Sequence, residues 1–366
     1  KGPTTARSYG DSDAALSETP RMPRFLVLLH LGLVVGDSLL NDEFCQVYYL
    51  GGSDCIALRS KVVANHSRAL PTLELGDASK PVLLFLHGWP DTSALWANQF
   101  EYFCAKGGKY FCVAPSWFDF HPDVPAAPRA ELYWDRMVDA VHAVVTEMRL
   151  SNITAVIFDF GAVIGFQFIW KYPHLVSRVI AIEVGNGGPT PPSGLPGLSH
   201  IPKAFSQLPP YQQTNVLAFE THNDSMMQRN AYAVISPCRG CAAITANWGW
   251  PYFIIQHNVS GDTWPERLAP TLSRAQWKYH LAPDFPEHVP LLFMYGKCEI
   301  GTGWPGSKPC APRKRFFFHQ PFTDWVTGRG VGSRIIAIDG AGHWIQCKQP
   351  AATNGNMSAW LNSLDT

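Results

Sequence analysis

Three short segments carry side chains that could do chemistry, and each directly follows a run of apolar residues typical of a buried strand. They read HGWPD at residues 87–91, FDFGA at 158–162 and GAGHW at 340–344. Parallel sheets collect their functional groups at the carboxyl ends of the strands. We therefore expect Asp159 and His343 to meet at one edge of a sheet, with the 87–91 loop beside them.

Asp159 stands where a sharp turn between a strand and a helix would expose a nucleophile. The small residues at 161–162 allow the close backbone approach that such a turn needs, and no Gly-x-Ser-x-Gly sequence occurs in the chain. A carboxylate there can displace a leaving group at sp³ carbon and form an alkyl-enzyme ester. His343 is the candidate base that activates water against this ester. The backbone N–H groups of Trp89 and Phe160 would stabilise the resulting oxyanion.

The order of apolar runs and helical patterns predicts the rest of the fold. Strands alternate with helices, which indicates a mostly parallel sheet covered on both faces. The predicted strands lie at 82–86, 111–114, 154–158, 178–184, 289–295 and 334–338, after β-rich stretches at 47–50 and 55–63, and the predicted helices lie at 130–150, 161–170 and 349–364. Regular periodicity fails between about 186 and 275.

From Pro81 onward, over about 285 residues, the chain resembles the epoxide hydrolase and haloalkane dehalogenase branch of the α/β-hydrolases. HGWPD is similar to the oxyanion motif of that branch, IFDFGAVIGFQFIWKYP to its nucleophile segment and GAGHWIQCKQP to its histidine segment. The resemblance implies an α/β-hydrolase fold with an inserted helical lid. We expect an N-terminal extension at 1–44, a core at 45–185 and 276–366, and a lid at 186–275.

A carboxylate should orient His343, and the family places it after either of two strands. Glu299, three residues after Gly296, is the first choice, and Glu183, near the end of the 178–184 strand, is the second. Asp284 is a distant third.

The resemblance also implies lid tyrosines that protonate the epoxide oxygen. Trp277 and Tyr279 belong to a QWKY segment similar to the family's lid end, but a lysine takes the tyrosine's place and Tyr279 comes one residue later. One residue turns a helical side chain by about 100°. Tyr232 and Tyr252 are the other candidates, and His87 is expected to lie beside the substrate.

Two phenylalanines flank the candidate nucleophile, Phe158 where His is common in the family and Phe160 where Trp is common. Phe160 lacks the side-chain N–H that holds a leaving halide, so an epoxide or related electrophile is favoured over a haloalkane. The alternative is a catalytically silent α/β-hydrolase that acts as a structural or docking subunit. Its contacts with a larger assembly would use the apolar segment 25–36 or the basic insertion 301–315.

The amino-acid composition limits the kinds of molecule that the protein is expected to bind. Lys+Arg and Asp+Glu balance at 29 each, so no broad basic field exists to hold nucleic acid. The 13% of aromatic residues favours a large core, with an aromatic pocket for a small apolar substrate as the alternative. The C-x-x-C at 238–241 has no second pair at zinc spacing, and we expect no metal or cofactor. Five N-x-S/T sequons and a start without Met favour the secretory pathway or an organelle such as the mitochondrion.

Overall fold

The computed structural model describes the residue ranges 59–65, 68–105, 107–118, 129, 132, 134–185, 210–234, 244–253, 285–299, 309–314, 317–318 and 320–365. All of them belong to one unit of the chain that runs from Gly36 to Thr366. The predicted N-terminal extension, the stretch at 47–50 and the C-x-x-C lie outside these ranges. Within them, no helix is long and apolar enough to cross a membrane.

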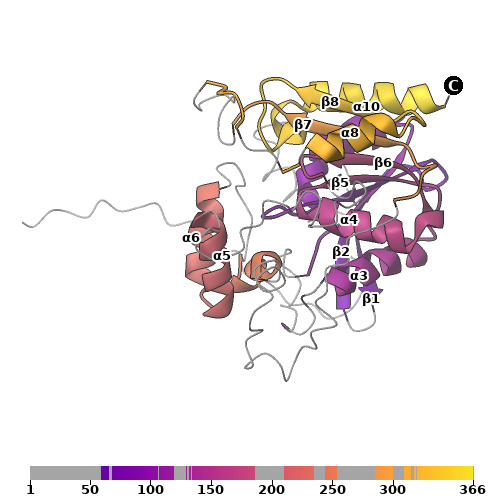
Figure 1. Ribbon diagram of the computed structural model, residues 1–366. Coiled ribbons are helices and arrows are strands. Elements are labelled where there is room, and N and C mark those ends of the chain that lie inside the picture. Colours follow the sequence, from indigo (N-terminus) through magenta and orange to yellow (C-terminus); the bar gives the residue numbers. More distant parts are fainter. Residues whose placement is uncertain are drawn as a thin grey trace, which may run out of the picture. The chain divides into compact units, whose positions relative to one another are not determined.

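An eight-stranded sheet forms the centre of the fold, in the order β1-β2-β4-β3-β5-β6-β7-β8 (Figure 1). The strands are β1 (Arg59–Asn65), β2 (Arg68–Leu75), β3 (Val82–Leu86), β4 (Phe111–Pro115), β5 (Ile153–Phe158), β6 (Val176–Ile182), β7 (Leu291–Gly296) and β8 (Arg334–Ile338). β4, β3, β5, β6, β7 and β8 are parallel neighbours, whereas β1 and β2 form an antiparallel edge. The predicted mostly parallel sheet of the α/β-hydrolase fold is confirmed.

Helices follow most of the strands. They are α2 (Ala97–Cys104), α3 (Trp134–Glu147), α4 (Phe160–Lys171), α5 (Pro210–Glu220), α6 (Asp224–Val234), α8 (Gln320–Gly328), α9 (Ile345–Lys348) and α10 (Pro350–Leu364), with short 3₁₀ turns η1 (Ser93–Trp96), η3 (Pro173–Leu175) and η5 (Ala246–Gly249). α5, α6 and η5 all come from the long insertion between β6 and β7.

The central strands are apolar because both faces of the sheet are covered. Successive side chains of a strand point to opposite faces. In β3, Leu84 packs in one core cluster with residues of α3 and α4, while Phe85 packs in the other with residues of α2 and α10. β3, β4 and β5 are buried along their whole length. Burial of one such side chain stabilises the fold by about 1.5–3 kcal/mol, which is why continuous apolar runs predicted these strands.

β2 was not predicted, because its sequence RALPTLEL contains a proline and shows no clear apolar run. Proline has no N–H to donate and is confined to edges or strand starts. The register explains how Pro71 is tolerated: β2 pairs with β4 only from Thr72 onward.

The last helix is tied to the first part of the chain by buried amides. Gln99 of α2 donates to Asn354 Oδ1 of α10 at 2.8 Å and to the carbonyl oxygen of Gln346 at 3.2 Å. Asn354 donates in turn to the carbonyl oxygen of Asn98 at 3.0 Å. α10 is thereby fixed against α2 across about 250 residues of sequence.

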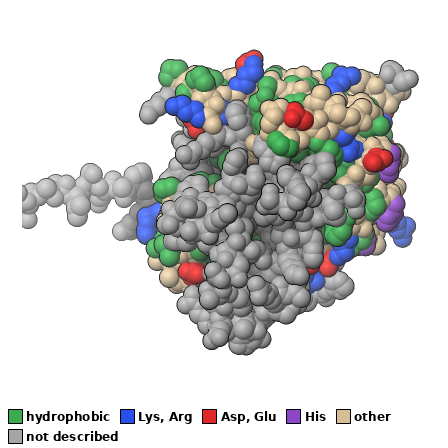
Figure 2. All heavy atoms as spheres, in the orientation of Figure 1, with side chains coloured by type: hydrophobic (Ala, Val, Ile, Leu, Met, Phe, Trp, Pro, Cys, Tyr) green, Lys and Arg blue, Asp and Glu red, His purple; other side chains and the backbone are tan. Residues whose placement is uncertain are grey.

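Two disulfides are present in the described part of the chain, Cys104–Cys112 and Cys298–Cys310, and Cys347 keeps a free thiol. The first joins α2 to β4, and the second closes a loop after β7. On the face drawn in Figure 2, basic and acidic side chains of the described residues are interspersed rather than gathered into one patch.

Candidate active site

Asp159 sits at the sharp turn between β5 and α4. Its backbone has φ 51° and ψ −121°, a region that non-glycine residues rarely adopt and that costs about 1–3 kcal/mol. The turn is tight because glycines surround it. A Cβ on Gly161 would overlap the carbonyl oxygen of Leu86, and a Cβ on Gly88 would overlap the side chain of Asp159. Asp159 therefore occupies a tight turn between a strand and a helix, as an elbow requires.

The carboxylate of Asp159 is held on both oxygens. The backbone N–H of Trp89 donates to Oδ1 at 2.9 Å, and Nε2 of His343 lies 3.3 Å from Oδ2. Phe160 begins α4, so its N–H lies at the positive end of the helix dipole, which stabilises negative charge. The side chain of Asp159 is 14% exposed, which leaves it reachable.

The other side of the imidazole faces a second carboxylate. Nδ1 of His343 lies 3.3 Å from Oε2 of Glu183, and Gly296 N–H donates to Oε1 of the same carboxylate at 2.5 Å. Burial of the imidazole lowers its pKa, but hydrogen bonds to Asp159 and Glu183 and their negative charges outweigh burial. Together they raise the pKa of His343 to about 9. The resting site therefore holds an imidazolium between two carboxylates at neutral pH.

Glu299, the first choice for the relay acid, points elsewhere. It accepts a hydrogen bond from the backbone N–H of Lys314 at 2.9 Å in an exposed position, and its own N–H donates to the carbonyl oxygen of Ala311. The geometry brings Glu183 to His343 and so favours the second choice. Its position after a strand makes Glu183 a candidate from the sequence, but no sequence pattern indicates the left-handed backbone (φ 73°) that Glu183 adopts.

Two tyrosines from the insertion between β6 and β7 contact the oxyanion loop and the elbow. Tyr211 comes from α5 and Tyr252 follows η5, and their rings lie 5.8 Å apart and perpendicular. The Trp89 ring lies 6.0 Å from Tyr211 and 5.3 Å from Tyr252. The Phe160 ring meets Tyr252 edge-on at 5.0 Å. The four rings form one aromatic cluster next to Asp159.

Both tyrosine hydroxyls stay protonated well above neutral pH. Burial, with a further contribution from the negative charge of Asp159, raises the pKa of Tyr211 to about 12. Burial, together with Tyr211 and Asp159, places the pKa of Tyr252 well above its ordinary value. Tyr252 was a sequence-based candidate, whereas Tyr211 was missed. Its place at the start of a helix, directly after the two prolines at 209–210, was the signal that could have revealed it.

His87 and Asp91 make the hydrogen bonds that support the 87–91 loop. Nε2 of His87 accepts from the Trp117 N–H at 3.2 Å, so Nδ1 carries the proton toward the Gly88 carbonyl oxygen at 2.9 Å. Burial lowers the pKa of His87 to about 3, so the ring is neutral and braces the loop. Asp91 Oδ2 accepts from Trp344 Nε1 at 3.0 Å, and burial raises the pKa of Asp91 to about 7.

The remaining candidates are placed as follows. Phe158 is fully buried, and its ring lies 4.8 Å from that of His343. Tyr232 belongs to α6, but its side chain lies outside the described residues, as do Trp277 and Tyr279. Among the described residues, no group of His, Cys, Asp and Glu side chains could hold a metal ion.

Comparison with known proteins gives matches over most of the chain. The family model described as alpha/beta hydrolase fold matches residues 81–239. Epoxide hydrolase 1 of Caenorhabditis elegans is 25% identical over 45% of this chain and 39% of its own length. Epoxide hydrolase 3 of Mus musculus is 24% identical over 86% of this chain and 80% of its own length. A haloalkane dehalogenase of Mycobacterium marinum is 28% identical over 38% of this chain and 45% of its own length.

The chain thus spans less than half of the length of two of these relatives and four fifths of the third. Among solved structures, potato (Solanum tuberosum) epoxide hydrolase I has a TM-score of 0.53 and 18% identity, with 84% of this chain and 99% of that chain covered. The α/β-hydrolase fold is confirmed, and so is the resemblance to the branch that holds epoxide hydrolases and haloalkane dehalogenases.

Proposed function

Because the chain has the α/β-hydrolase fold and relatives among the epoxide hydrolases and haloalkane dehalogenases, we propose that it hydrolyses a small apolar epoxide through an Asp159 alkyl ester. One observation carries the proposal. The rings of Tyr211, which is half-buried, and Tyr252, which is buried, contact the ring of Trp89, and both hydroxyls are protonated. The backbone N–H of Trp89 donates to one oxygen of the Asp159 carboxylate, and His343 faces the other oxygen. This is a nucleophile, a base and a pair of acids in one site.

Alkylation is the first step. Oδ2 of Asp159 attacks an epoxide carbon, the ring C–O bond breaks, and a tyrosine hydroxyl donates its proton to the departing oxygen. Oδ1, which already accepts the Trp89 N–H at 2.9 Å, becomes the ester carbonyl oxygen. A pKa of about 12 keeps Tyr211 protonated at neutral pH, and its proton moves as the ring opens because the developing alkoxide is a stronger base than the phenolate.

Hydrolysis of the ester is the second step. Formation of the ester removes the negative charge of Asp159, which is one of the causes that hold the pKa of His343 at about 9. The pKa of the imidazole therefore falls, its proton passes to the tyrosinate left by the first step, and His343 becomes a neutral base at the stage that needs one. It takes a proton from water, the hydroxide adds to the ester carbonyl carbon, and the Trp89 N–H stabilises the oxyanion. Collapse breaks the ester C–O bond, the leaving alkoxide takes a proton from the imidazolium, and the acid proton of Asp159 passes back to His343. The diol is released, and the carboxylate and the imidazolium are restored.

We also propose that the insertion between β6 and β7 acts as a lid over this site. Its described helices supply Tyr211 and Tyr252, whose rings cover Trp89 and Phe160. Such an aromatic cluster favours a small apolar substrate and excludes water from the alkylation step.

Repeated turnover of an aliphatic or styrene-type epoxide in ¹⁸O-water tests the nucleophile. Asp159 should gain ¹⁸O, because water attacks the ester carbonyl carbon and the oxygen of that water stays in the carboxylate. Tyr211→Phe and Tyr252→Phe should each lower epoxide kcat about 10²–10⁴-fold. A folded wild-type protein that forms no adduct on Asp159 with any epoxide or alkyl halide would support the silent, structural alternative instead.

A haloalkane is the second candidate substrate, favoured by one observation. The indole N–H of Trp89 is buried and has no hydrogen-bond partner among the described residues, so it can donate to a leaving halide. Displacement of halide needs no proton. The two Tyr→Phe variants should therefore leave alkylation by a haloalkane unchanged, and Trp89→Phe should slow it.

A further inference from the structure

A third charged side chain, that of Arg313, contacts the carboxylate of Glu183 that faces His343. The side chains of Arg313 and Glu183 have no exposed surface. Arg313 Nη1 donates to Oε2 of Glu183 at 2.5 Å and to the carbonyl oxygen of Gly296 at 3.2 Å. Oε2 is also the oxygen that faces His343 Nδ1. One carboxylate oxygen is thus shared by a guanidinium and an imidazole.

The segment that carries Arg313 is anchored on both sides. On the N-terminal side, the Cys298–Cys310 disulfide and an antiparallel bridge between Cys298 and Pro312 hold it against the end of β7. The N–H of Arg313 also donates to the carbonyl oxygen of Lys297 at 2.9 Å. These contacts fix the backbone from which the guanidinium reaches Glu183.

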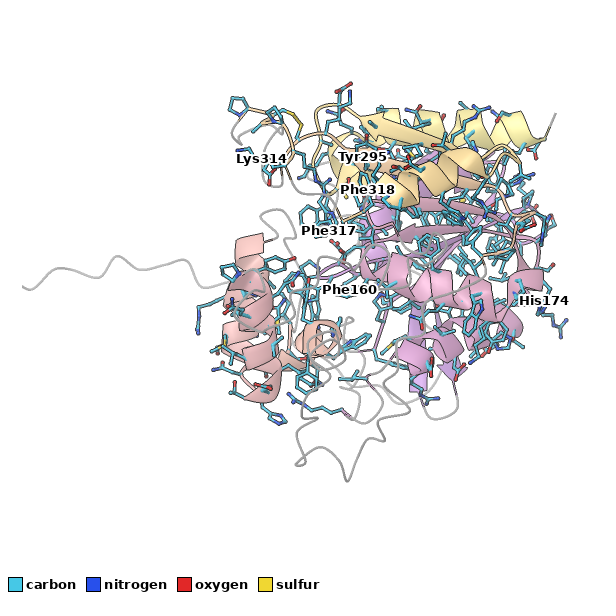
Figure 3. The ribbon with its side chains drawn as sticks, in the orientation of Figure 1. Phe160, His174, Tyr295, Lys314, Phe317 and Phe318 are labelled. Atoms are coloured by element: carbon cyan, nitrogen blue, oxygen red, sulfur yellow. A yellow bond between two sulfur atoms is a disulfide. The ribbon has the colours of Figure 1, made fainter. Side chains whose placement is uncertain are left out.

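On the C-terminal side, Phe317 forms a parallel bridge with Val184, the residue after Glu183. The Phe317 ring lies 5.6 Å from the Arg313 guanidinium and 5.0 Å from the His343 ring. Figure 3 marks Phe317 in this segment, near the side chains at the end of β7. The half-buried phenyl ring therefore lies beside both the buried guanidinium and the buried imidazole.

Without Arg313, three carboxyl groups would surround the imidazole of His343 with no other cation among the described residues beside them. Asp159 faces His343 after β5, Glu183 faces it after β6, and Asp91 on the loop after β3 acts on it at longer range. Arg313 is the cation that the described residues place against one of these carboxylates. A guanidinium that neutralises Glu183 weakens the hold of the site on the imidazole proton.

We propose that Arg313 is a positioning residue: it fixes Glu183 against His343 and offsets its charge, so that the imidazole can lose its proton once Asp159 is esterified. The Cys298–Cys310 loop holds it there. The inference rests on the proposed function for its role in turnover, but the effect on His343 exists in the free protein.

The test compares Arg313→Met, Arg313→Lys and the matched control Lys314→Met, which removes the neighbouring positive charge from an exposed side chain. The first measurement is the NMR titration of the His343 ring in the free protein, which needs no substrate. Arg313→Met should raise the midpoint by about one unit, while Lys314→Met should leave it unchanged and Arg313→Lys should stay near the wild type. Equal shifts in the Met variants, or no shift in Arg313→Met, would overturn the proposal.

The second measurement separates the two steps of turnover on an epoxide. Arg313→Lys keeps the charge but loses the planar fork, so hydrolysis of the ester should slow at least several-fold while the rate of alkylation stays the same. If Arg313→Met does not fold, Arg313→Lys decides. Wild-type rates of both alkylation and ester hydrolysis in Arg313→Lys would then refute the inference. Failure of the wild type to form any ester would count against the proposed function and leave the titration to decide the role of Arg313.

Discussion

At the scale of single residues, the two carboxylates that flank His343 share an unusual backbone. Asp159 has φ 51° and Glu183 has φ 73°, and each follows directly after a parallel strand. Such backbones persist only when the surrounding structure enforces them. Here glycine contacts around Asp159 and the Gly296 N–H on Glu183 do so. The strained backbone therefore lies at the two residues whose carboxylates face the two ring nitrogens of His343.

Asp159→Asn should lower the pKa of His343. The substitution removes one of the two carboxylate charges that hold this pKa at about 9, as ester formation would, and the midpoint should fall by about one unit or more. NMR titration of the ring measures it. Asp139→Asn, at an exposed carboxylate paired with Lys171, is the control, and a wild-type midpoint in Asp159→Asn would contradict the proposed switch.

Asp91→Asn should stabilise the protein at neutral and alkaline pH. Burial raises the pKa of Asp91 from 3.8 to about 7, so the folded state keeps a proton that the unfolded chain has lost. The free energy of unfolding of the wild type therefore falls as pH rises from about 4 to 7. Between pH 5 and 8 the variant should gain about 3 kcal/mol relative to the wild type. Urea unfolding at both pH values measures this, and a constant difference would argue against a buried ionisation.

At the scale of elements, the sequence predicted the strands that are buried on both faces of the sheet, because such strands must be continuously apolar. β4, β5, β6 and β8 lie within two residues of the apolar runs that predicted them, and α10 begins one residue after the predicted start. The relay acid could not be chosen in this way. Glu183 and Glu299 both follow strands, and they are distinguished by their contacts: Glu183 faces His343 and Arg313, whereas Glu299 accepts from the backbone N–H of Lys314. Tyr211 was missed because the insertion between β6 and β7 has no regular periodicity.

The loop closed by Cys298–Cys310 gives a prediction at this scale. Cys298→Ala with Cys310→Ala should cost about 3 kcal/mol of stability, the chain-entropy value for a loop of this length, and should raise the His343 midpoint because Arg313 loses its anchor. Cys104→Ala with Cys112→Ala removes the other disulfide and should lower stability without moving that midpoint. Urea unfolding and ring titration are the two measurements. Equal midpoint shifts in both pairs would show that the loop has no special link to the site.

At the scale of the whole molecule, the site collects residues from the loop after β3, the turns after β5 and β6, the insertion, the disulfide loop and the segment before α9. The stability of the fold is therefore linked to the charge of the site. The pKa of His343 is about 9 in the folded protein, against 6.5 for an ordinary imidazole. Binding of its proton therefore contributes to the free energy of unfolding, and this contribution is fully present below pH 6.5 and is lost as pH rises toward 9. The loss should be about 3 kcal/mol.

Thermal unfolding of the wild type and of His343→Gln between pH 6.5 and 9 measures that loss. The wild-type midpoint should decline over this range, and the midpoint of the variant should decline less. Parallel curves would mean that the imidazole proton does not contribute to folding.

The amide contacts between α2 and α10 also bear on the order in which the protein can be made. Gln99 leaves the ribosome long before Asn354, the residue to which it donates. Gln99 also donates to the carbonyl oxygen of Gln346 in α9, the short helix that begins two residues after His343. A nascent chain that stops short of residue 350 contains Asp159, Glu183 and both tyrosines, but not α10, which the amide contacts hold against α2. Its carboxylates would then have no base between them. During biosynthesis, completion of the active centre must wait for the last helix to be released and docked.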